Sequence, residues 1–140
     1  MKILAAVDGS NYTKKMLAYL AAHDEWLGPQ HQYTVLHVVG PVPPRAAAVL
    51  DREALKGYYD DEAEKVFRPI RKFFAKQKLE AQYVSKVGPA AEQIVAFCEK
   101  QPFDLVVMGS HGHTSFTNLL LGSVATKVIA EGHTPVLIVR

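Results

Sequence analysis

Short apolar runs alternate along the chain with longer segments in which apolar residues recur at helical spacing. The apolar runs predict buried strands at residues 3–7, 33–39, 82–87, 105–108 and 135–139. The segments between them predict helices from about 11 to 28, 46 to 78, 89 to 101 and 122 to 131. Runs with few polar interruptions are typical of strands covered on both faces. The alternation therefore predicts a single α/β domain with a parallel sheet and helices on both of its faces.

Prolines and glycines predict where these segments are interrupted. Gly28 followed by Pro29 predicts the end of the first helix. Residues 40–44 contain three prolines, so we expect no regular structure there. Pro69 lies inside the second helical segment and predicts either a kink or a division into two helices.

The composition fits one globular domain in a reducing compartment. The chain has 140 residues, a hydrophobic content of 49% and a formal net charge of +2. Its basic residues are interleaved with acids, which disfavours a nucleic-acid partner. Cys98 is the only cysteine, so an internal disulfide is excluded. The first apolar run ends at Asp8, and none approaches the ~20 residues of a membrane span, so we expect a cytoplasmic protein without a membrane segment.

The carboxyl ends of the strands are the candidate ligand site, because open parallel sheets bind ligands there, at the point where the strand order reverses. The segments after Val7, Val38 and Met108 are therefore the candidates. Asp8 follows the first strand directly and is expected either to contact a ligand or to cap the first helix.

Glycines and a predicted helix start follow the fourth strand. Gly109 and Gly112 come directly after that strand, and Gly122 and Ser123 follow after nine further residues. Glycine lets a backbone approach a phosphate closely and reach positive φ, and a helix N-terminus offers free amides and the positive end of a dipole. With the hydroxyls of Ser110 and Ser123, these features predict an anion site. The alternative is an ordinary glycine-containing loop with a serine cap.

The sequence excludes two familiar phosphate-binding motifs and disfavours a metal site. The loop is not a Walker A motif, because it lacks a Gly-Lys-Ser/Thr run, and the first strand does not lead into a dinucleotide fingerprint. His111 and His113 have no third ligand in reach, so we expect solvated loop histidines and no metal site.

The chain resembles the universal stress protein family, in its nucleotide-binding branch. That branch carries the motif Gly-x2-Gly-x9-Gly-Ser/Thr, and Gly109, Gly112, Gly122 and Ser123 stand at that spacing. The likeness also covers residues 6–10, 36–38, 88–90 and 135–139, and so spans the chain. The resemblance implies one Rossmann-like domain over residues 1–140, with an open five-stranded parallel sheet in the order 3-2-1-4-5.

The resemblance also implies a ligand and its contacts. The ligand is ATP, or AMP or ADP, with Mg²⁺ expected beside the phosphates. Asp8 matches an acid near the ribose and phosphates that helps to hold the Mg²⁺, and Val38 matches a backbone contact to adenine. Ala125 stands where some members have a hydroxyl, so one phosphate contact is expected to be absent. The implied contact residues are Ala6, Val7, Asp8, Val38, Met108, Gly109, Gly112, Gly122, Ser123 and Val124.

A regulatory module that binds ATP is the leading functional hypothesis. No Lys or Arg lies between Gly109 and Ser123, so we expect no catalytic residues and no fast phosphoryl transfer. A second hypothesis is a slow ATPase or an autophosphorylating protein, whose candidate acceptors are Ser110, Thr114, Ser115 and Ser123. A nucleotide-independent interaction dimer is a third hypothesis, and a flavodoxin-like electron carrier is a fourth.

The last predicted strand suggests self-association. Val136–Val139 is short, apolar and terminal in the sheet, and an exposed strand of this kind is a pairing hazard unless it is covered. Antiparallel pairing with the same strand of a second copy would give a two-fold homodimer. The resemblance implies the same mode of pairing.

Overall fold

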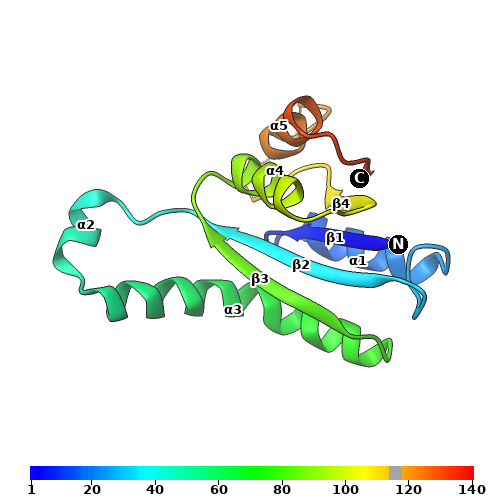
Figure 1. The fold of residues 1–140 in the computed structure, drawn as a ribbon, viewed down its shortest axis with the longest axis horizontal. Helices are drawn as coiled ribbons and strands as arrows, with labels where there is room; N and C mark the ends of the chain where they lie inside the picture. The colour runs from blue at the N-terminus through cyan, green and yellow to red at the C-terminus, as the bar shows by residue number, and fades with distance from the viewer. Residues whose placement is uncertain (114–117) are drawn as a thin grey trace.

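The computed structural model describes residues 1–113 and 118–140, which form one sheet covered by helices on both faces (Figure 1). The strands are β1 (Lys2–Val7), β2 (Gln32–Val39), β3 (Ala81–Val87), β4 (Leu105–Gly109) and β5 (Val136–Val139). The helices are α1 (Asn11–Ala22), α2 (Pro44–Val49), α3 (Arg52–Lys76), α4 (Ala90–Lys100) and α5 (Ser123–Glu131). The strand order is β3-β2-β1-β4-β5, and every neighbouring pair is parallel. The predicted α/β fold and strand order are confirmed.

Alternate side chains of the central strands enter two separate cores. In β1, Ile3 and Val7 pack on the face covered by α1 and α3, whereas Leu4 packs on the face covered by α4 and α5. Each fully buried side chain of this size contributes about 1.5–3 kcal/mol relative to exposure. The two cores hold β1 and β4 side by side, and their carboxyl ends form the point where the strand order reverses.

The first helix ends earlier than its sequence predicts. It stops at Ala22, six residues before Gly28. The ring of His23 stacks on Tyr19 at a centroid distance of 4.1 Å, and its Nδ1–H donates to the Tyr19 carbonyl at 2.7 Å. The His23 side chain thus satisfies a carbonyl of the last turn, and its extended backbone ends the helix.

The segment after β2 divides into two helices, but not at the proline that suggested a division. Pro44 occupies the first position of α2, where the missing amide hydrogen costs nothing, so the expectation of irregular structure through residue 44 was wrong for this residue. The break lies before Arg52, where the Asp51 carboxylate accepts from the Ala54 amide at 2.7 Å and caps α3. Helix α3 continues through Pro69, which is exposed, because Phe67 and Ile70 beside it are buried in the core.

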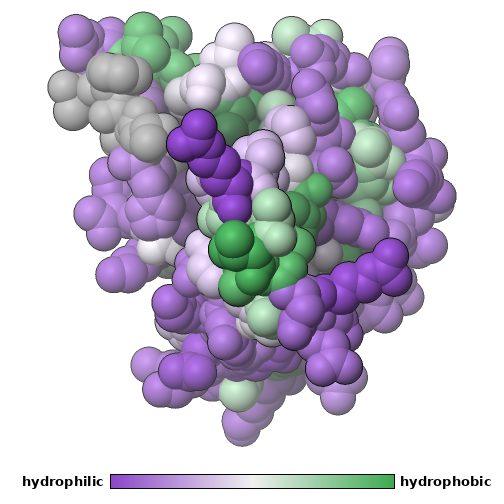
Figure 2. Space-filling view, turned by 90° about the vertical axis from the view of Figure 1, so that its left-hand side faces the viewer, coloured by the Kyte–Doolittle hydropathy of each residue, from purple (hydrophilic) through white to green (hydrophobic). Residues whose placement is uncertain are grey.

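Helix α2 and the first turns of α3 extend beyond the carboxyl edge of the sheet as an arm (Figure 1). Val49 and Leu50 at its turn are 83% and 40% exposed. Figure 2 views the molecule from the end at the left of Figure 1 and shows an apolar patch near the centre of a mostly hydrophilic surface. Within the described part of the chain, no helix is long and apolar enough to cross a membrane.

Candidate functional site

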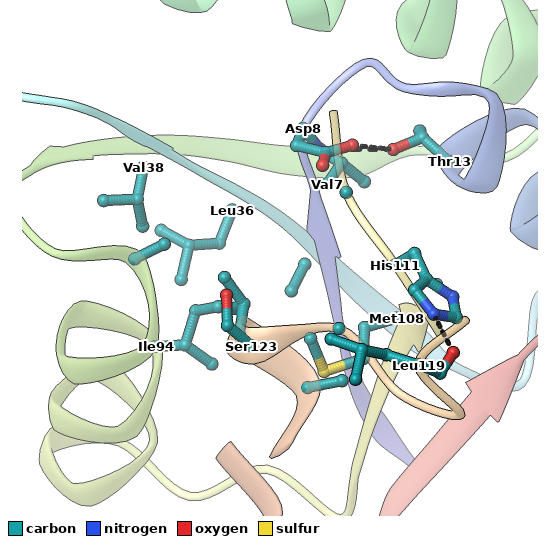
Figure 3. Close-up of a pocket in the computed structure, with 17 residues that line it drawn as sticks. Val7, Asp8, Thr13, Leu36, Val38, Ile94, Met108, His111, Leu119 and Ser123 are labelled. Carbon is teal, nitrogen blue, oxygen red and sulfur yellow. Dashed lines mark hydrogen bonds between the residues drawn. The ribbon is translucent and has the colours of Figure 1, made fainter. Parts of the chain in front are cut away.

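A pocket of about 240 Å³ opens at the carboxyl ends of β1 and β4, against α4 and α5 (Figure 3). All ten ligand contacts that the family resemblance implies lie in its lining: Ala6, Val7, Asp8, Val38, Met108, Gly109, Gly112, Gly122, Ser123 and Val124. The lining also contains seven residues that were not among these contacts: Thr13, Leu36, Ala90, Ile94, His111, Leu119 and Ala125. Leu36 was foreseeable, because it shares a strand face with Val38. The positions of Ala90 and Ile94 depend on how α4 packs.

The pocket has one apolar side and one polar side. Leu36, Val38 and Ile94 lie together on the apolar side, whereas Asp8 and His111 lie across the pocket from them (Figure 3). A cavity of this kind accepts a ligand that is flat and apolar at one end and polar at the other.

The turn from β1 into α1 satisfies its own hydrogen bonds around Asp8. The Asp8 Oδ1 accepts from the Ser10 amide at 2.9 Å and from the Thr13 hydroxyl at 3.0 Å. The Thr13 Oγ1 in turn accepts from the amides of Asp8 and Gly9 at 3.1 and 3.2 Å. Ser10, not Asp8, is the residue before the helix, and its side chain makes no capping hydrogen bond. Asp8 therefore organises the turn with one carboxylate oxygen, while Oδ2 is directed at Gly112.

The three motif glycines stand where an added Cβ would meet neighbouring atoms at short distance, and none of them has a positive φ. A Cβ at Gly109 would lie 2.6 Å from the Tyr12 Cβ, and one at Gly112 would lie 2.6 Å from the Asp8 Oδ2. A Cβ at Gly122 would lie 3.0 Å from the His111 Cα. The positive-φ glycines are Gly9 and Gly88, so the expectation that the motif glycines reach positive φ was wrong. Their first role is to let the chain pack around the pocket.

Helix α5 begins at the pocket with its first amides free of a capping side chain. The residue before the helix is Gly122, which has no side chain, so the serine cap of the alternative interpretation is absent. The first intrahelical bond runs from the Thr126 amide to the Gly122 carbonyl at 3.0 Å. The amides of Ser123, Val124 and Ala125 precede it, so they have no acceptor within the helix. All three residues line the pocket, which gives it the positive end of a helix dipole.

The two loop histidines differ from each other. His111 is half-buried in the pocket wall, and its ring nitrogens lie 2.9 Å from the Ser110 Oγ and 2.8 Å from the Leu119 carbonyl oxygen. The expectation of a solvated side chain was therefore wrong for His111. His113 is exposed, and its Nε2–H donates to the Asp8 carbonyl at 2.7 Å, which joins the loop after β4 to the end of β1.

The serine hydroxyls that were candidates either to accept a phosphoryl group or to donate a hydrogen bond to phosphate occupy different surroundings. Ser110 is only 1% exposed, and its hydroxyl is engaged by His111, so it does not line the pocket as a phosphate donor. Ser123 is exposed at the start of α5. Thr114 and Ser115 lie outside the described residues.

The described lining contains no Lys or Arg, and Asp8 is its only carboxylate. No group of three or more His, Cys, Asp or Glu side chains with metal-binding geometry occurs among residues 1–113 and 118–140. Cys98 lies outside the pocket, half-buried on α4, and burial raises the pKa of its thiol above the usual value, while a hydrogen bond with Thr134 acts in the opposite direction. The positive potential of the described lining therefore comes from the backbone amides at the start of α5.

These features define an open α/β domain with a ligand pocket at the point where the strand order reverses. The sequence profile of the Universal stress protein family matches residues 1–140. The chain belongs to the universal stress protein family.

Individual relatives agree with this assignment. The chain is 34% identical over 138 residues to a universal stress protein of Thermus aquaticus, a match that covers 99% of this chain and 97% of that protein. It is also 34% identical over 99 residues to universal stress protein MJ0531 of Methanocaldococcus jannaschii, covering 71% of this chain but only 56% of that longer protein.

Solved structures share the fold. The structure of MJ0577 from Methanocaldococcus jannaschii superposes with a TM-score of 0.80 at 29% identity, covering 99% of this chain and 94% of that chain. A family protein from Arabidopsis thaliana, solved with AMP bound, has a TM-score of 0.71 at 12% identity and covers 99% of this chain and 90% of that one.

Proposed function

We propose that this protein is a regulatory module of the nucleotide-binding branch that binds an adenine nucleotide, ATP with Mg²⁺, in the pocket between β1 and β4. The observation that carries the proposal is the pairing of an apolar wall with the uncapped start of α5 in one cavity. The base would lie against Leu36, Val38 and Ile94, and the phosphates would accept hydrogen bonds from the amides of α5. The AMP bound to the Arabidopsis relative supports the same class of ligand.

The residues present fit a Mg²⁺ ion held mainly by the ligand. Magnesium in nucleotide sites is usually bound by one or two carboxylates together with phosphate oxygens. The Asp8 Oδ1 is engaged in the turn, whereas Oδ2 faces the loop at Gly112, so Oδ2 is the atom that would hold the ion. When bound, the ion would neutralise phosphate charge that the side chains of the described lining do not balance.

The protein is proposed to hold ATP rather than to consume it rapidly. Phosphoryl transfer relies on positioned cations and an oriented nucleophile, and the described lining has neither Lys nor Arg. Release of inorganic phosphate at a rate no higher than that of a variant unable to bind ATP is the expected result. Rapid turnover that depends on the intact pocket would contradict this part of the proposal.

We also propose that the protein forms a cytoplasmic homodimer through β5. This strand lies at one edge of the sheet and is paired only on its β4 side within the described chain. Antiparallel pairing with the same strand of a second copy would satisfy its outer backbone groups. Light scattering at micromolar concentration checks this, and a monomer would contradict it.

Calorimetric titration of the ligand-free protein with ATP, ADP and AMP, each with and without Mg²⁺, tests the nucleotide proposal. We expect ATP with Mg²⁺ to bind with a Kd of about 10 μM or tighter. Val38→Trp should abolish binding, because an indole would occupy the space against the apolar wall. Val87→Trp is the matched control, since Val87 is an exposed valine on β3 outside the pocket, and it should bind like the parent. A folded parent that binds none of the three nucleotides would overturn the proposal.

A further inference from the structure

His111 is held at both ring nitrogens in the wall of the pocket. Because a carbonyl oxygen only accepts, the Nε2–H of His111 donates to the Leu119 carbonyl, at 2.8 Å. In the neutral ring the Nδ1 then accepts from the Ser110 hydroxyl, at 2.9 Å. The ring also lies against Tyr12, with a centroid distance of 5.1 Å. These contacts fix the imidazole and join the two ends of the loop that carries the motif glycines.

The same contacts accommodate a protonated ring. In the imidazolium the Nδ1–H donates, and a serine hydroxyl can accept as well as donate, so only the hydroxyl hydrogen of Ser110 must rotate. The bond from Nε2–H to Leu119 is unchanged. Both contacts become charge-assisted hydrogen bonds, which are stronger than neutral ones. Protonation therefore adds a positive charge to the wall without breaking the contacts that hold the loop.

His111 lies in the pocket wall, and its backbone is close to the residue that precedes α5. The His111 Cα is 3.0 Å from the position that a Cβ on Gly122 would occupy, and Gly122 directly precedes the uncapped start of α5. In Figure 3, His111 and Asp8 lie on the polar side of the pocket, across from the apolar wall. Histidine is the side chain that ordinarily changes charge between about pH 5 and 8.

The elements around His111 are the end of β1, helix α1, the first turn of α5 and its own loop. Asp8 at the end of β1 lines the same pocket and carries a charge opposite to that of an imidazolium. On α1 the Lys15 ammonium lies 4.7 Å from the ring centroid of Tyr12, and the Tyr12 ring in turn contacts the His111 ring. The first turn of α5 contributes Ser123, Val124 and Ala125, which carry no charge, and His113 is exposed further along the loop.

We propose that His111 takes up a proton when the pocket binds the phosphates of its nucleotide, so that nucleotide affinity is coupled to pH. This inference rests on the proposed function and identifies the side chain that supplies positive charge where the described lining has no Lys or Arg. A bound anion stabilises the imidazolium, and by thermodynamic reciprocity an imidazolium strengthens binding of the anion. Affinity rises as the pH falls from about 8 to about 6, by up to about tenfold per pH unit.

Calorimetric titration with ATP in buffers of different ionisation enthalpy measures the protons taken up on binding. His111→Gln is the informative variant, because its amide can still donate to Leu119 but carries no charge. The parent should take up about half a proton more than H111Q at pH ~6.5, and its affinity should change about three- to tenfold more between pH ~8 and ~6. Because the ATP phosphates titrate equally in both proteins, the difference isolates His111.

His133→Gln is the control, since it removes an exposed histidine outside the pocket lining, and its proton uptake should equal that of the parent. Equal uptake by the parent and H111Q, with ATP bound by both, would overturn the coupling and leave the nucleotide proposal standing. Absence of ATP binding by the folded parent at every pH would overturn both proposals.

If the H111Q variant does not fold, an NMR measurement on the parent protein tests the same coupling. In the parent, the NMR titration midpoint of the His111 ring should move to higher pH when ATP saturates the site. An unchanged midpoint in the presence of bound ATP would overturn the coupling.

Discussion

Two helices, α1 and α5, begin at the carboxyl edge of the sheet on its opposite faces, and their first turns are used differently. The turn into α1 carries Asp8 and Thr13, whose side chains bind the amides of residues 8–10 and each other. The turn into α5 ends in Gly122, which has no side chain to offer. The pocket is lined by the first three residues of α5 but only by Thr13 of α1.

This difference shows why two similar strand-to-helix turns need not both bind an anion. A carboxylate at the start of α1 already complements the dipole of that helix. The start of α5 has free amides next to an open cavity, so a negative ligand is stabilised more strongly there than at the start of α1. The presence of a helix N-terminus is therefore a weaker guide to an anion site than the side chains of the turn that leads into the helix.

Among these variants, Gly122→Val should have the largest effect on ATP binding, because its side chain would fill the space before α5. The new side chain would meet the His111 backbone at 3.0 Å and the Ser110 carbonyl oxygen at 3.1 Å. We expect loss of detectable ATP binding and a fall of about 1–3 kcal/mol in the free energy of unfolding, measured by calorimetry and by urea denaturation. Gly57→Ala is the control glycine, because a Cβ there meets nothing within 4 Å, and it should stabilise α3 by about 0.5–1 kcal/mol. Unchanged ATP affinity in G122V would contradict this account of the α5 start.

Ser123→Pro and Asn11→Pro form a matched pair at the first positions of α5 and α1. Proline is tolerated at the first helical position but removes one free amide hydrogen. The preceding residues, Gly122 and Ser10, already have the extended backbone that proline requires. The S123P variant should lose about 10- to 100-fold in ATP affinity while remaining folded, since a hydrogen bond to a charged group contributes about 1.5–3 kcal/mol. The N11P variant should bind like the parent. Equal losses of ATP affinity in S123P and N11P would show that the start of α5 is no more important for binding than the start of α1.

Thr13→Val tests whether the α1 turn depends on its own side chains. Thr13 is 5% exposed, and valine preserves its shape while removing the hydroxyl that binds Asp8 and Gly9. We expect a loss of about 1–3 kcal/mol in the free energy of unfolding, because the partly buried amides of Asp8 and Gly9 lose their acceptor. A variant as stable as the parent in chemical denaturation would mean that water replaces the hydroxyl.

Ser10→Ala should have the smallest effect of the series. The Ser10 hydroxyl is buried and has no hydrogen-bond partner among the described residues, and it does not cap α1. Its removal should change the free energy of unfolding by less than about 0.5 kcal/mol, or raise it slightly. A loss as large as that of T13V would reveal a buried partner for this hydroxyl, such as an ordered water molecule.

The local pattern of the sequence was enough to locate the strands and the pocket. Apolar runs such as residues 105–108 predict buried strands, and strands alternating with helices predict a parallel sheet whose ligands bind at the carboxyl ends. The spacing from Gly109 to Ser123 then marked the loop, whereas the full set of contact residues, all of which lie in the pocket lining, was implied by the family resemblance. Local spacing succeeds here because both the strands and the motif are contiguous or nearly contiguous in the chain.

Only the tertiary structure decided why particular residues occupy their places. Gly109 packs against Tyr12, and Gly112 against the Asp8 carboxylate, across about a hundred residues of sequence. The end of α1 depends on the His23 ring, and α3 passes Pro69 because its neighbours are buried. The role of His111 depends on Ser110 beside it and on the Leu119 carbonyl eight residues away. Hydrophobic periodicity records which side chains avoid water, but not which backbone atoms meet, and those meetings set the shape and charge of the pocket.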